Sequence, residues 1–577
     1  MIRHASDGKP RPLPSWRPLA LLCCFFGFAA LLIWRAVDLQ VLRREFLLDQ
    51  GKARFLREVA IPAHRGMIRD RNGEPLAIST PVDSVWANPG ELLLAGRDAI
   101  ARIARLLQLE TKALISDLQA RREREFVYLR RQITPSLGQK VMDLQVPGVG
   151  LRREYKRFYP AGEVTGHVIG FTNIDGHGLE GIELAFNDWL SGQPGAQRVI
   201  RDRLGRVIEG VELLREAKPG HDLTLSIDLG LQYFAYRALK LAVQRHDAVG
   251  GSLVVLDARD GEVLAMVNQP GFNPNVRAQL IASHYRNRAV TDAFEPGSTL
   301  KPFAVAAALA SGRYTPRTTV DTRPGTLRVG GHVIHDVHNH GILSVAGVLE
   351  RSSNVGVSKI ALSLDRGRLW SLLAGAGFGR RTGSGFPSEV GGYLSPMPPD
   401  SRIERATLAF GAGIAVTPLQ LARAYSAIAN AGVLMPVSFL HRAEPPQGRR
   451  IMDETVARQV LLMLEGVVTV DGTGTKAMLA GYRVAGKTGT IRKVVAGGYT
   501  REQHVAWFAG MVPVKAPRFI CVVVINEPRD GVYYGGQIAA PLFRDTMAAA
   551  VRLYNVPPDA VPGRPSDGLI VARGDKP

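Results

Sequence analysis

Cysteine is scarce in this sequence, with three among 577 residues. Cys23 and Cys24 stand together in an apolar N-terminal run, which leaves Cys521 as the only cysteine of the remaining chain. One cysteine cannot pair within that part, so the disulfide framework of a small secreted scaffold is excluded. Cys521 stands in an apolar segment, and we interpret it as a core residue.

Acidic residues are also few in proportion. The 52 Asp and Glu residues stand against 72 Lys and Arg residues, which gives a net charge of +20. A basic chain suits an anionic partner such as nucleic acid, a membrane surface or a cell wall. The sequence has no zinc-finger spacing, no RNA-binding aromatic signature and no basic low-complexity arm. It therefore predicts no nucleic-acid partner.

Long uncharged apolar runs are limited to one, at residues 19–34. With Pro18 it has 17 residues, the short end of a membrane-spanning helix. Trp16 and Trp34 bracket it, as interfacial aromatic residues do. A cleaved signal peptide is the alternative, but no clear small-x-small cleavage site follows the run. We predict an uncleaved anchor with a cytoplasmic N-terminus, because basic residues precede it. These are Arg3, Lys9, Arg11 and Arg17.

The most informative stretch that is present is residues 295–303, which read EPGSTLKPF. Ser298 and Lys301 are three residues apart, so on a helix they lie on the same face. The apolar run at 304–310 predicts that this helix is buried, and Pro302 is tolerated in its first turn. Ser298 stands at the positive end of the helix dipole. The pattern predicts a serine nucleophile activated by a lysine, although Ser-x-x-Lys is short enough to recur by chance, as it does at Ser6.

Two further patterns follow in a fixed order. Ser352 and Asn354 form Ser-x-Asn on a turn predicted between helices, and residues 487–490 read KTGT just before the last apolar strands. Each triplet alone is a weak signal. The three together, in this order and in these contexts, are specific.

The predicted elements indicate an α+β fold. Apolar strands at 252–257 and 262–267 form a hairpin around residues 259–261. Further strands are expected near the C-terminus, so one antiparallel sheet is formed from both ends of the domain and packs against a helical cluster. These strands cover 506–513 and 519–526. Amphipathic or charged helices are expected at 36–58, 93–145 and 229–244, and a Gly-rich structural block at 157–183.

The three motifs resemble those of the penicillin-binding protein and serine β-lactamase superfamily. A wider set of patterns resembles class B penicillin-binding proteins of the cell-division, FtsI-like type, over roughly residues 16–550. These patterns are residues 65–73, 157–181, 285–288, 416–421, 472–475 and 533–536. The sequence has no glycosyltransferase-sized domain between anchor and pedestal, so the chain resembles the monofunctional members.

The resemblance implies a domain order. A cytoplasmic tail is expected at 1–17, a single transmembrane anchor at 18–37, and an elongated α/β pedestal of the dimerisation type at 38–218. A penicillin-binding/serine β-lactamase-like transpeptidase domain, with an antiparallel sheet and a helical cluster, is expected at 219–556. The last residues, 557–577, are rich in proline, glycine and charge, which predicts disorder.

The resemblance also implies the chemistry. Ser298 is the nucleophile and Lys301 the base, made neutral by burial beside Lys487. Ser352 relays a proton, and Asn354 hydrogen-bonds the peptide and orients Lys301. The catalytic set is therefore Ser298, Lys301, Ser352, Asn354 and Lys487. The substrate-binding set is Thr488, Gly489, Thr490, Tyr533 and Tyr534, and the backbone N–H groups of Ser298 and Thr490 form the oxyanion hole.

The implied function is peptidoglycan D,D-transpeptidation during septal cell-wall synthesis, in the bacterial inner membrane with a periplasmic catalytic domain. Stem peptides, β-lactams, the membrane and other division proteins are the expected partners, and no cofactor is needed. Elongation-type transpeptidases, D-Ala-D-Ala carboxypeptidases and β-lactamases are alternatives. A divisome scaffold or β-lactam sensor is the non-enzymatic alternative.

Two features stand outside this pattern. His332, His335, Asp336, His338 and His340 crowd one segment, but their spacing matches no standard zinc site, and we predict no metal. The family usually carries Tyr-Gly-Tyr-Gly before its Val-Thr-Pro segment, whereas this chain has Phe410-Gly411-Ala412-Gly413. We expect one wall of the cleft to differ at Ala412.

Overall fold

The computed structural model describes residues 16–44, 56–201, 207–276, 280–495 and 498–560. Contacts divide the chain into two compact units. The smaller unit consists of Met1–Ala63, Pro81–Glu154 and Gln193–Lys218, and the larger of His64–Thr80, Tyr155–Gly192 and Pro219–Pro577. The predicted pedestal, 38–218, therefore includes two segments that pack within the larger unit. Most of the predicted tails, 1–17 and 557–577, lies outside the described residues.

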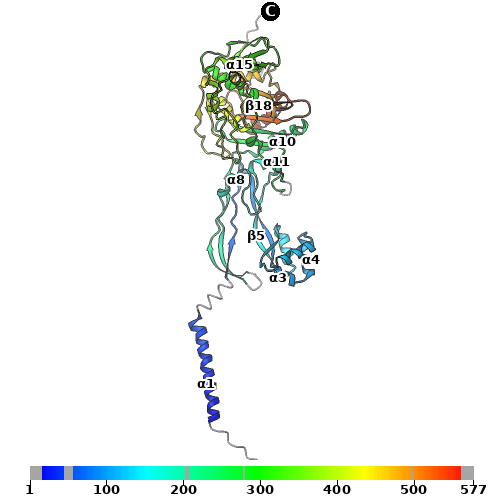
Figure 1. The fold of residues 1–577 in the computed structure, drawn as a ribbon, viewed down its shortest axis with the longest axis vertical. Helices are drawn as coiled ribbons and strands as arrows, with labels where there is room; N and C mark the ends of the chain where they lie inside the picture. Colours follow the sequence, from blue (N-terminus) through cyan, green and yellow to red (C-terminus); the bar gives the residue numbers. More distant parts are fainter. Residues whose placement is uncertain (1–15, 45–55, 202–206, 277–279, 496–497, 561–577) are drawn as a thin grey trace, which may run out of the picture. The chain divides into compact units, whose positions relative to one another are not determined.

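The apolar run forms α1 (Trp16–Val37), the dark blue helix in Figure 1. A π-helical turn, Asp38–Leu42, continues it. Large apolar side chains project outward, and that of Phe25 is 72% exposed. Among the described residues, one helix is long and apolar enough to cross a membrane, over Leu19–Leu42. The predicted helix at 36–58 is wrong at its end, because β1 begins at Leu56 and its backbone pairs with β6. Residues 45–55 lie outside the described residues.

The smaller unit contains a three-stranded antiparallel sheet and a helical cluster. The sheet consists of β1 (Leu56–Ile61), β6 (Gly195–Arg201) and β7 (Val207–Arg215). The cluster contains α3 (Pro89–Leu94), α4 (Arg97–Leu106), α5 (Thr111–Ala120) and α6 (Pro135–Met142). Ile100, Ile103 and Leu118 form part of its core.

The prediction of helix throughout 93–145 is wrong at β4 (Val127–Ile133). Here the backbone pairs with the end of β3 (Pro75–Ala87), with Tyr128 opposite Trp86. Tyr128 also donates a hydrogen bond to Glu154. Pairing with a distant strand decides the conformation, as is usual for strands whose own sequence is charged.

The larger unit is built on a five-stranded antiparallel sheet in the order β10-β9-β19-β18-β17. Its strands are β9 (Gly250–Asp257), β10 (Val263–Gln269), β17 (Ala485–Val495), β18 (Gly498–Val512) and β19 (Phe519–Asn526). The expected sheet from both ends of the domain is therefore confirmed. Along β19 the side chains alternate between two cores, with Val522 in one and Cys521 in the other. This period of two arises because successive strand residues point to opposite faces.

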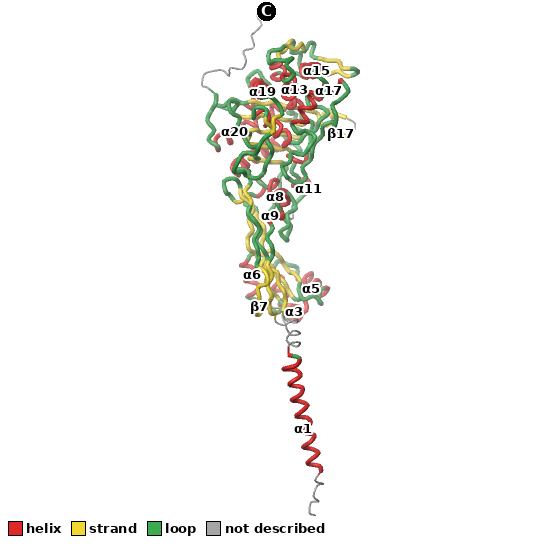
Figure 2. Tube along the Cα trace, turned by 90° about the vertical axis from the view of Figure 1, so that its left-hand side faces the viewer, coloured by secondary structure: helices red, strands yellow, loops and turns green. Residues whose placement is uncertain are grey.

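Helices cover both faces of this sheet (Figure 2). One face packs against α10 (Leu229–Arg245) and α20 (Gly535–Leu553). The other packs against α13 (Lys301–Leu309), α18 (Pro418–Ala429) and α19 (Glu454–Val467). The predicted helix at 229–244 is confirmed as α10.

Shorter elements complete the larger unit. Its other helices include α14 (Val345–Glu350), α15 (Asn354–Ser363), α16 (Arg368–Gly375) and α17 (Arg402–Leu408). Two small antiparallel pairs are β11 (Thr319–Asp321) with β14 (Ile342–Ser344), and β12 (Thr326–Val329) with β13 (His332–His335). The one-turn helices are α7 (Gly166–Ile169), α8 (Gly181–Ala185), α9 (Asn187–Leu190), α11 (Ala282–Tyr285) and α12 (Arg288–Thr291). The short strands are β2 (Ile68–Arg69), β8 (Leu223–Thr224), β15 (Val433–Leu434) and β16 (Arg449–Arg450). The longer strand β5 (Val149–Phe158) begins in the smaller unit and ends in the larger one.

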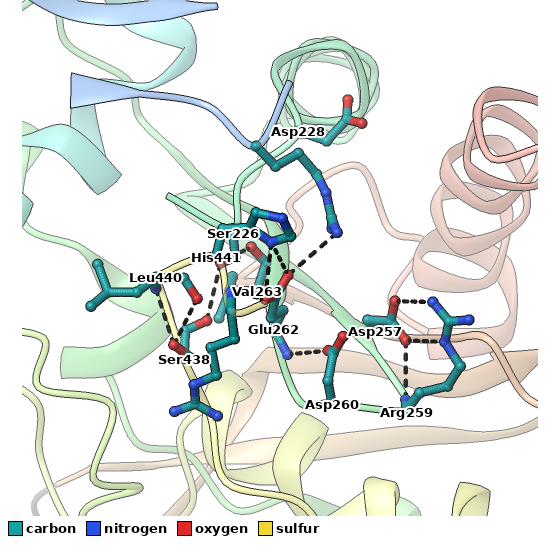
Figure 3. Close-up of polar contacts among 12 residues, drawn as sticks. Ser226, Asp228, Asp257, Arg259, Asp260, Glu262, Val263, Ser438, Leu440 and His441 are labelled. Atoms are coloured by element: carbon teal, nitrogen blue, oxygen red, sulfur yellow. Dashed lines mark hydrogen bonds and ion pairs between the residues drawn. The ribbon is translucent and has the colours of Figure 1, made fainter. Parts of the chain in front are cut away.

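A buried glutamate fixes the β9–β10 hairpin within this unit. Glu262 is 1% exposed, and Figure 3 shows it facing His441, whose Nδ1 lies 3.1 Å from Glu262 Oε1. The backbone N–H of Arg442 donates to the same oxygen at 2.6 Å, and Arg71 Nη2 lies 3.4 Å from Oε2. Arg71 lies in the turn after β2, where Gly73 has φ +91°. The carboxylate therefore links three chain segments.

Candidate active site

Ser298 lies in a 3₁₀ turn, Gly297–Leu300, that leads directly into α13. The predicted buried helix at 304–310 is confirmed as far as Leu309, since every residue of α13 is buried, whereas Ala310 follows the helix and is exposed. Ser298 thus stands one turn ahead of the α-helix, half-buried, while Lys301 at the start of α13 is fully buried. Thr299 Oγ1 donates to the Pro296 carbonyl at 2.7 Å, and the Tyr425 hydroxyl donates to the Thr299 carbonyl at 2.7 Å. These contacts fix the turn from both sides.

Close backbone packing holds the same turn. Gly411 has φ +82°, and a methyl group at its Cα would lie 2.2 Å from the Gly297 carbonyl oxygen. A methyl group on Gly489, in β17, would lie 2.9 Å from the Pro296 carbonyl oxygen. Only glycine fits both positions. The Ser298 turn therefore lies between the loop at 410–413 and β17.

Ser352 connects two buried lysines. Lys301 Nζ donates to the Ser352 carbonyl oxygen and to Ser352 Oγ, the latter at 3.2 Å. Lys487 Nζ donates to the same Oγ at 2.9 Å. Both lysine side chains are fully buried. The motifs at 298–301, 352–354 and 487–490 therefore meet at one place, with the Ser352 hydroxyl in contact with both amines.

Burial makes both amines easier to deprotonate. It lowers the pKa of Lys301 well below its usual range, and the charge of Lys487 lowers it further, while Asp336 acts in the opposite direction. Burial also lowers the pKa of Lys487, to about 7. Desolvation disfavours the charged form of an amine. Lys301 is thus suited to accept a proton, as a general base must.

The remaining predicted residues surround this centre. Asn354 begins α15, and its Nδ2 donates to the His335 carbonyl at 3.1 Å. Asn354 was expected to orient Lys301, but the hydrogen bonds of the Lys301 amine are with Ser352. On β17, Lys487 Nζ also donates to the Thr488 hydroxyl at 3.4 Å. Thr488 Oγ1 lies 2.9 Å from Thr473 Oγ1, and Thr490 Oγ1 accepts the Gly535 N–H at 3.0 Å.

An aromatic stack lies beside this end of β17. The rings of Tyr533 and Tyr534 are 4.7 Å apart, and Tyr533 stacks on His504 at 4.1 Å. These tyrosines immediately precede Gly535, which binds Thr490. Sequence reasoning missed His504, because its place depends on the β17–β18 register, which sets it opposite Arg492.

Comparison with known proteins agrees with this arrangement. Residues 251–548 match the penicillin binding protein transpeptidase domain, and residues 60–225 match the penicillin-binding protein dimerisation domain. The chain is 42% identical over 566 residues to the peptidoglycan D,D-transpeptidase FtsI of Escherichia coli K12, covering 97% of this chain and 96% of that protein. The chain belongs to the class B penicillin-binding proteins of the FtsI type. As a member of this family it is a serine acyltransferase of the transpeptidase class.

Other relatives extend the similarity. The chain is 43% identical over 547 residues to the probable peptidoglycan D,D-transpeptidase PbpC of Pseudomonas aeruginosa, covering 95% of this chain and 97% of that protein. The transpeptidase domain of penicillin-binding protein 3 from Burkholderia pseudomallei is 42% identical with a TM-score of 0.54, covering 58% of this chain and 98% of that one. Penicillin-binding protein 3 from Mycobacterium tuberculosis, complexed with aztreonam, is 28% identical with a TM-score of 0.68, covering 87% and 98%.

In this penicillin-binding protein, a glutamate beside the Ser298 turn links the loop at 410–413 to the start of β18. Glu295 Oε1 accepts the Gly413 N–H at 2.7 Å, and the Tyr499 hydroxyl donates to both carboxylate oxygens at 3.0 and 3.1 Å. Burial raises the pKa of Glu295, and burial with this carboxylate raises the pKa of Tyr499 to about 12. A cavity of about 380 Å³, lined mainly by apolar residues, adjoins Glu295. Sequence reasoning gave neither residue a role.

The His-rich segment, residues 332–340, consists of β13 and the residues that follow it. No group of three His, Cys, Asp or Glu side chains within the described ranges is arranged to hold a metal ion. His332 and His335 lie at the ends of β13 and are exposed. Asp336 follows them and contacts the start of α15.

Proposed function

We propose that this protein is a peptidoglycan D,D-transpeptidase that cross-links stem peptides during septal cell-wall synthesis through an acyl-enzyme on Ser298. The observation that carries the proposal is the hydrogen bonding of the Ser352 hydroxyl by both Lys301 and Lys487, next to the Ser298 turn. Family membership supports the reaction class. The septal role follows from the names of the FtsI relatives.

In the acylation step, Ser298 Oγ attacks the carbonyl carbon between the two D-Ala residues of a stem peptide. Its proton passes to the neutral amine of Lys301, one helical turn away. The backbone N–H groups of Ser298 and Thr490 stabilise the oxyanion. When the C–N bond breaks, the leaving D-Ala amine takes the proton of Ser352 Oγ, which Lys301 restores.

In the transfer step, an amine of a neighbouring stem peptide attacks the ester. A C–N bond forms, the C–O bond to Ser298 breaks, and the amine proton returns through Lys301 to Ser298 Oγ. Covalent catalysis thereby divides one difficult step into two easier ones. A β-lactam resembles the D-Ala-D-Ala bond and acylates Ser298 in the same way.

The substrate is held by polar groups on β17 and by aromatic rings. Lys487, Thr488 and Thr490 bind the terminal carboxylate, and Asn354 and the backbone at Gly489 bind the peptide. The ring pair at 533–534 lies at the edge of the cleft. The lysine charge is well suited to this role, since a carboxylate bound beside Lys487 favours its protonated form.

The apolar helix α1 anchors the protein in the inner membrane, with the catalytic domain in the periplasm. The basic residues before the helix support this orientation. The expected partners are peptidoglycan, β-lactams and other division proteins. Removal of residues 1–45 is expected to give a soluble protein that still binds penicillin, measured by fractionation and fluorescent labelling.

The nucleophile is tested by labelling with fluorescent penicillin and mass mapping of the labelled peptide. Wild type is expected to carry the label on Ser298, and Ser298→Ala to carry none. Ser311→Ala, in the turn that follows α13, is the matched control and keeps the label. Retained labelling of folded Ser298→Ala would overturn the proposal.

A further inference from the structure

The Asp336 carboxylate makes three contacts with consecutive residues at the start of α15. Oδ1 accepts the backbone N–H groups of Asn354 and of Val355, the latter at 3.0 Å. Oδ2 accepts the Ser353 hydroxyl at 2.5 Å. The first N–H groups of a helix have no partner within it, and a negative charge is stabilised at that end. Asp336 therefore supplies from outside what the start of α15 needs.

The residue just before these contacts, Ser352, has an unusual backbone. Its φ is +59°, a left-handed conformation that is strained for a non-glycine residue and persists only when the surroundings enforce it. On one side, the N–H groups of Ser352 and Ser353 donate to the Leu349 and Val348 carbonyls of α14. On the other side, the restraint comes from Asp336. This conformation lets Ser352 present both its carbonyl and its hydroxyl to Lys301.

Asp336 is itself fixed by the β12–β13 hairpin. Its backbone N–H donates to the Gly325 carbonyl at 2.9 Å. Ile334, one residue before His335, is buried against Val329 and Ala406. The His335 carbonyl accepts the side-chain amide of Asn354 at 3.1 Å. The hairpin thus holds the Ser-x-Asn motif through adjacent residues, 335 and 336.

We propose that Asp336 is a positioning residue of the transpeptidase, which holds Ser352 in the conformation that joins it to Lys301 and Lys487. The role rests on the proposed function of those three residues. It also gives the His-rich segment a purpose, as the support of a catalytic motif.

A second effect follows from the charge of Asp336. The charged groups that act on Lys301 are Lys487, which favours the neutral amine, and Asp336, which favours the ammonium. His340 is also near, because both Asp336 and Lys301 influence its pKa. Removal of the Asp336 charge therefore lowers the pKa of Lys301. Since the neutral amine is the active form, the acid limb of the acylation rate then moves to lower pH.

The test compares Asp336→Ala, Asp336→Asn and the control Asp321→Asn in the full-length protein. Asp321 lies nearby on β11, is exposed and pairs with Arg323. The acylation constant k2 and the binding constant K for a fluorescent penicillin are measured separately from pH 5 to pH 9. Asp336→Ala is expected to lower k2 about 10–100-fold with little change in K, because small misplacement of reacting groups costs about 100-fold.

Asp336→Asn keeps one acceptor oxygen without the charge, so a smaller loss in k2 is expected, together with an acid limb moved to lower pH. Asp321→Asn is expected to match wild type in both. An unchanged k2 in folded Asp336→Ala, or an unmoved limb in Asp336→Asn, would overturn the proposal. Failure of the proposed function is recognised separately, by retained labelling of Ser298→Ala.

Discussion

The two serine turns of the site are held by different forces. The Ser298 turn is enclosed by backbone, with Gly411 and Gly489 so near that no Cβ fits at either. The Ser352 turn has a strained φ of +59° and is held by hydrogen bonds to charged groups. The first turn should therefore respond to volume and the second to charge. We therefore expect substitutions that add volume to act mainly at the Ser298 turn, and changes of pH to act mainly at the Ser352 turn.

Lys301 serves both turns, so its loss should have the largest effect. Lys301→Met removes the proposed base of Ser298 and a donor to Ser352, so acylation by penicillin should slow by about 1,000-fold or more, as for other members of a catalytic unit. Lys359→Met on α15 is the control, because Lys359 donates to the Asp321 carbonyl on the flanking strand. Stopped-flow acylation rates decide, and a near-normal rate for Lys301→Met would exclude its role as base.

Gly411→Ala tests whether the Ser298 turn is sensitive to added volume. The new methyl group would overlap the Gly297 carbonyl at 2.2 Å, on a backbone with φ +82°. We expect a loss of about 2–4 kcal/mol in the free energy of unfolding, together with slower acylation. Gly413→Ala is the matched control, since its φ is +77° but nothing lies within 4 Å of its Cβ position. It should lose only about 1 kcal/mol. Equal losses in denaturant unfolding would contradict the packing argument.

Lys487→Met tests the role of charge at the Ser352 turn, through its effect on the free energy of unfolding. Burial lowers the native pKa of Lys487 to about 7, whereas the unfolded value is about 10.4. At pH values between these two pKa values the unfolded chain binds more protons than the folded chain, so the free energy of unfolding of the wild type rises with pH. At pH 7 the variant should be more stable than wild type by roughly 1–3 kcal/mol, and the gain should shrink towards pH 10.

Exposed Lys515 offers a control, since Lys515→Met should show no such pH dependence. Denaturant unfolding at several pH values measures both variants. A gain for Lys487→Met that does not change with pH would point to packing instead of charge.

Ala412→Tyr should have the smallest effect. An aromatic side chain can bury about 150–250 Å², and its absence beside the Ser298 turn leaves room for bulky β-lactam side chains. The variant should change the ranking of β-lactams by a few-fold without changing the reaction. Second-order acylation rates for a panel of β-lactams measure this, and a uniform shift across the panel would count against it.

Local patterns were sufficient for much of the fold and for predicting that the three motifs meet. Helical spacing predicted that Lys301 follows Ser298 by one turn, and apolar runs predicted β9, β10, β18 and β19. The order of the three motifs predicted that they meet, and the lysine contacts with Ser352 agree.

What the sequence could not provide depends on distant partners. The strand β4 forms because β3 is available to pair with it. Tyr499 reaches Glu295 across 204 residues, and the residues that follow Ser352 are bound by the Asp336 carboxylate at the end of another hairpin. The periodicity of a local segment cannot predict these long-range contacts. The sequence of residues 332–340 likewise did not indicate a supporting role for this segment, because that role is inferred from the contacts of Asp336 with Ser353 and Asn354.

The order of strands in the main sheet also bears on when the enzyme becomes active during its synthesis. The first strand, β9, pairs with β19, whose last residue is Asn526. Joining such distant segments requires closure of a long loop, and such contacts form late. Ser298, Lys301 and Ser352 are all synthesised before Lys487, which contributes to lowering the pKa of Lys301. A nascent or truncated chain that ends before residue 487 therefore carries Ser298, Lys301 and Ser352 without Lys487. We expect such a chain to remain inert towards peptidoglycan and penicillin until the C-terminal strands are in place.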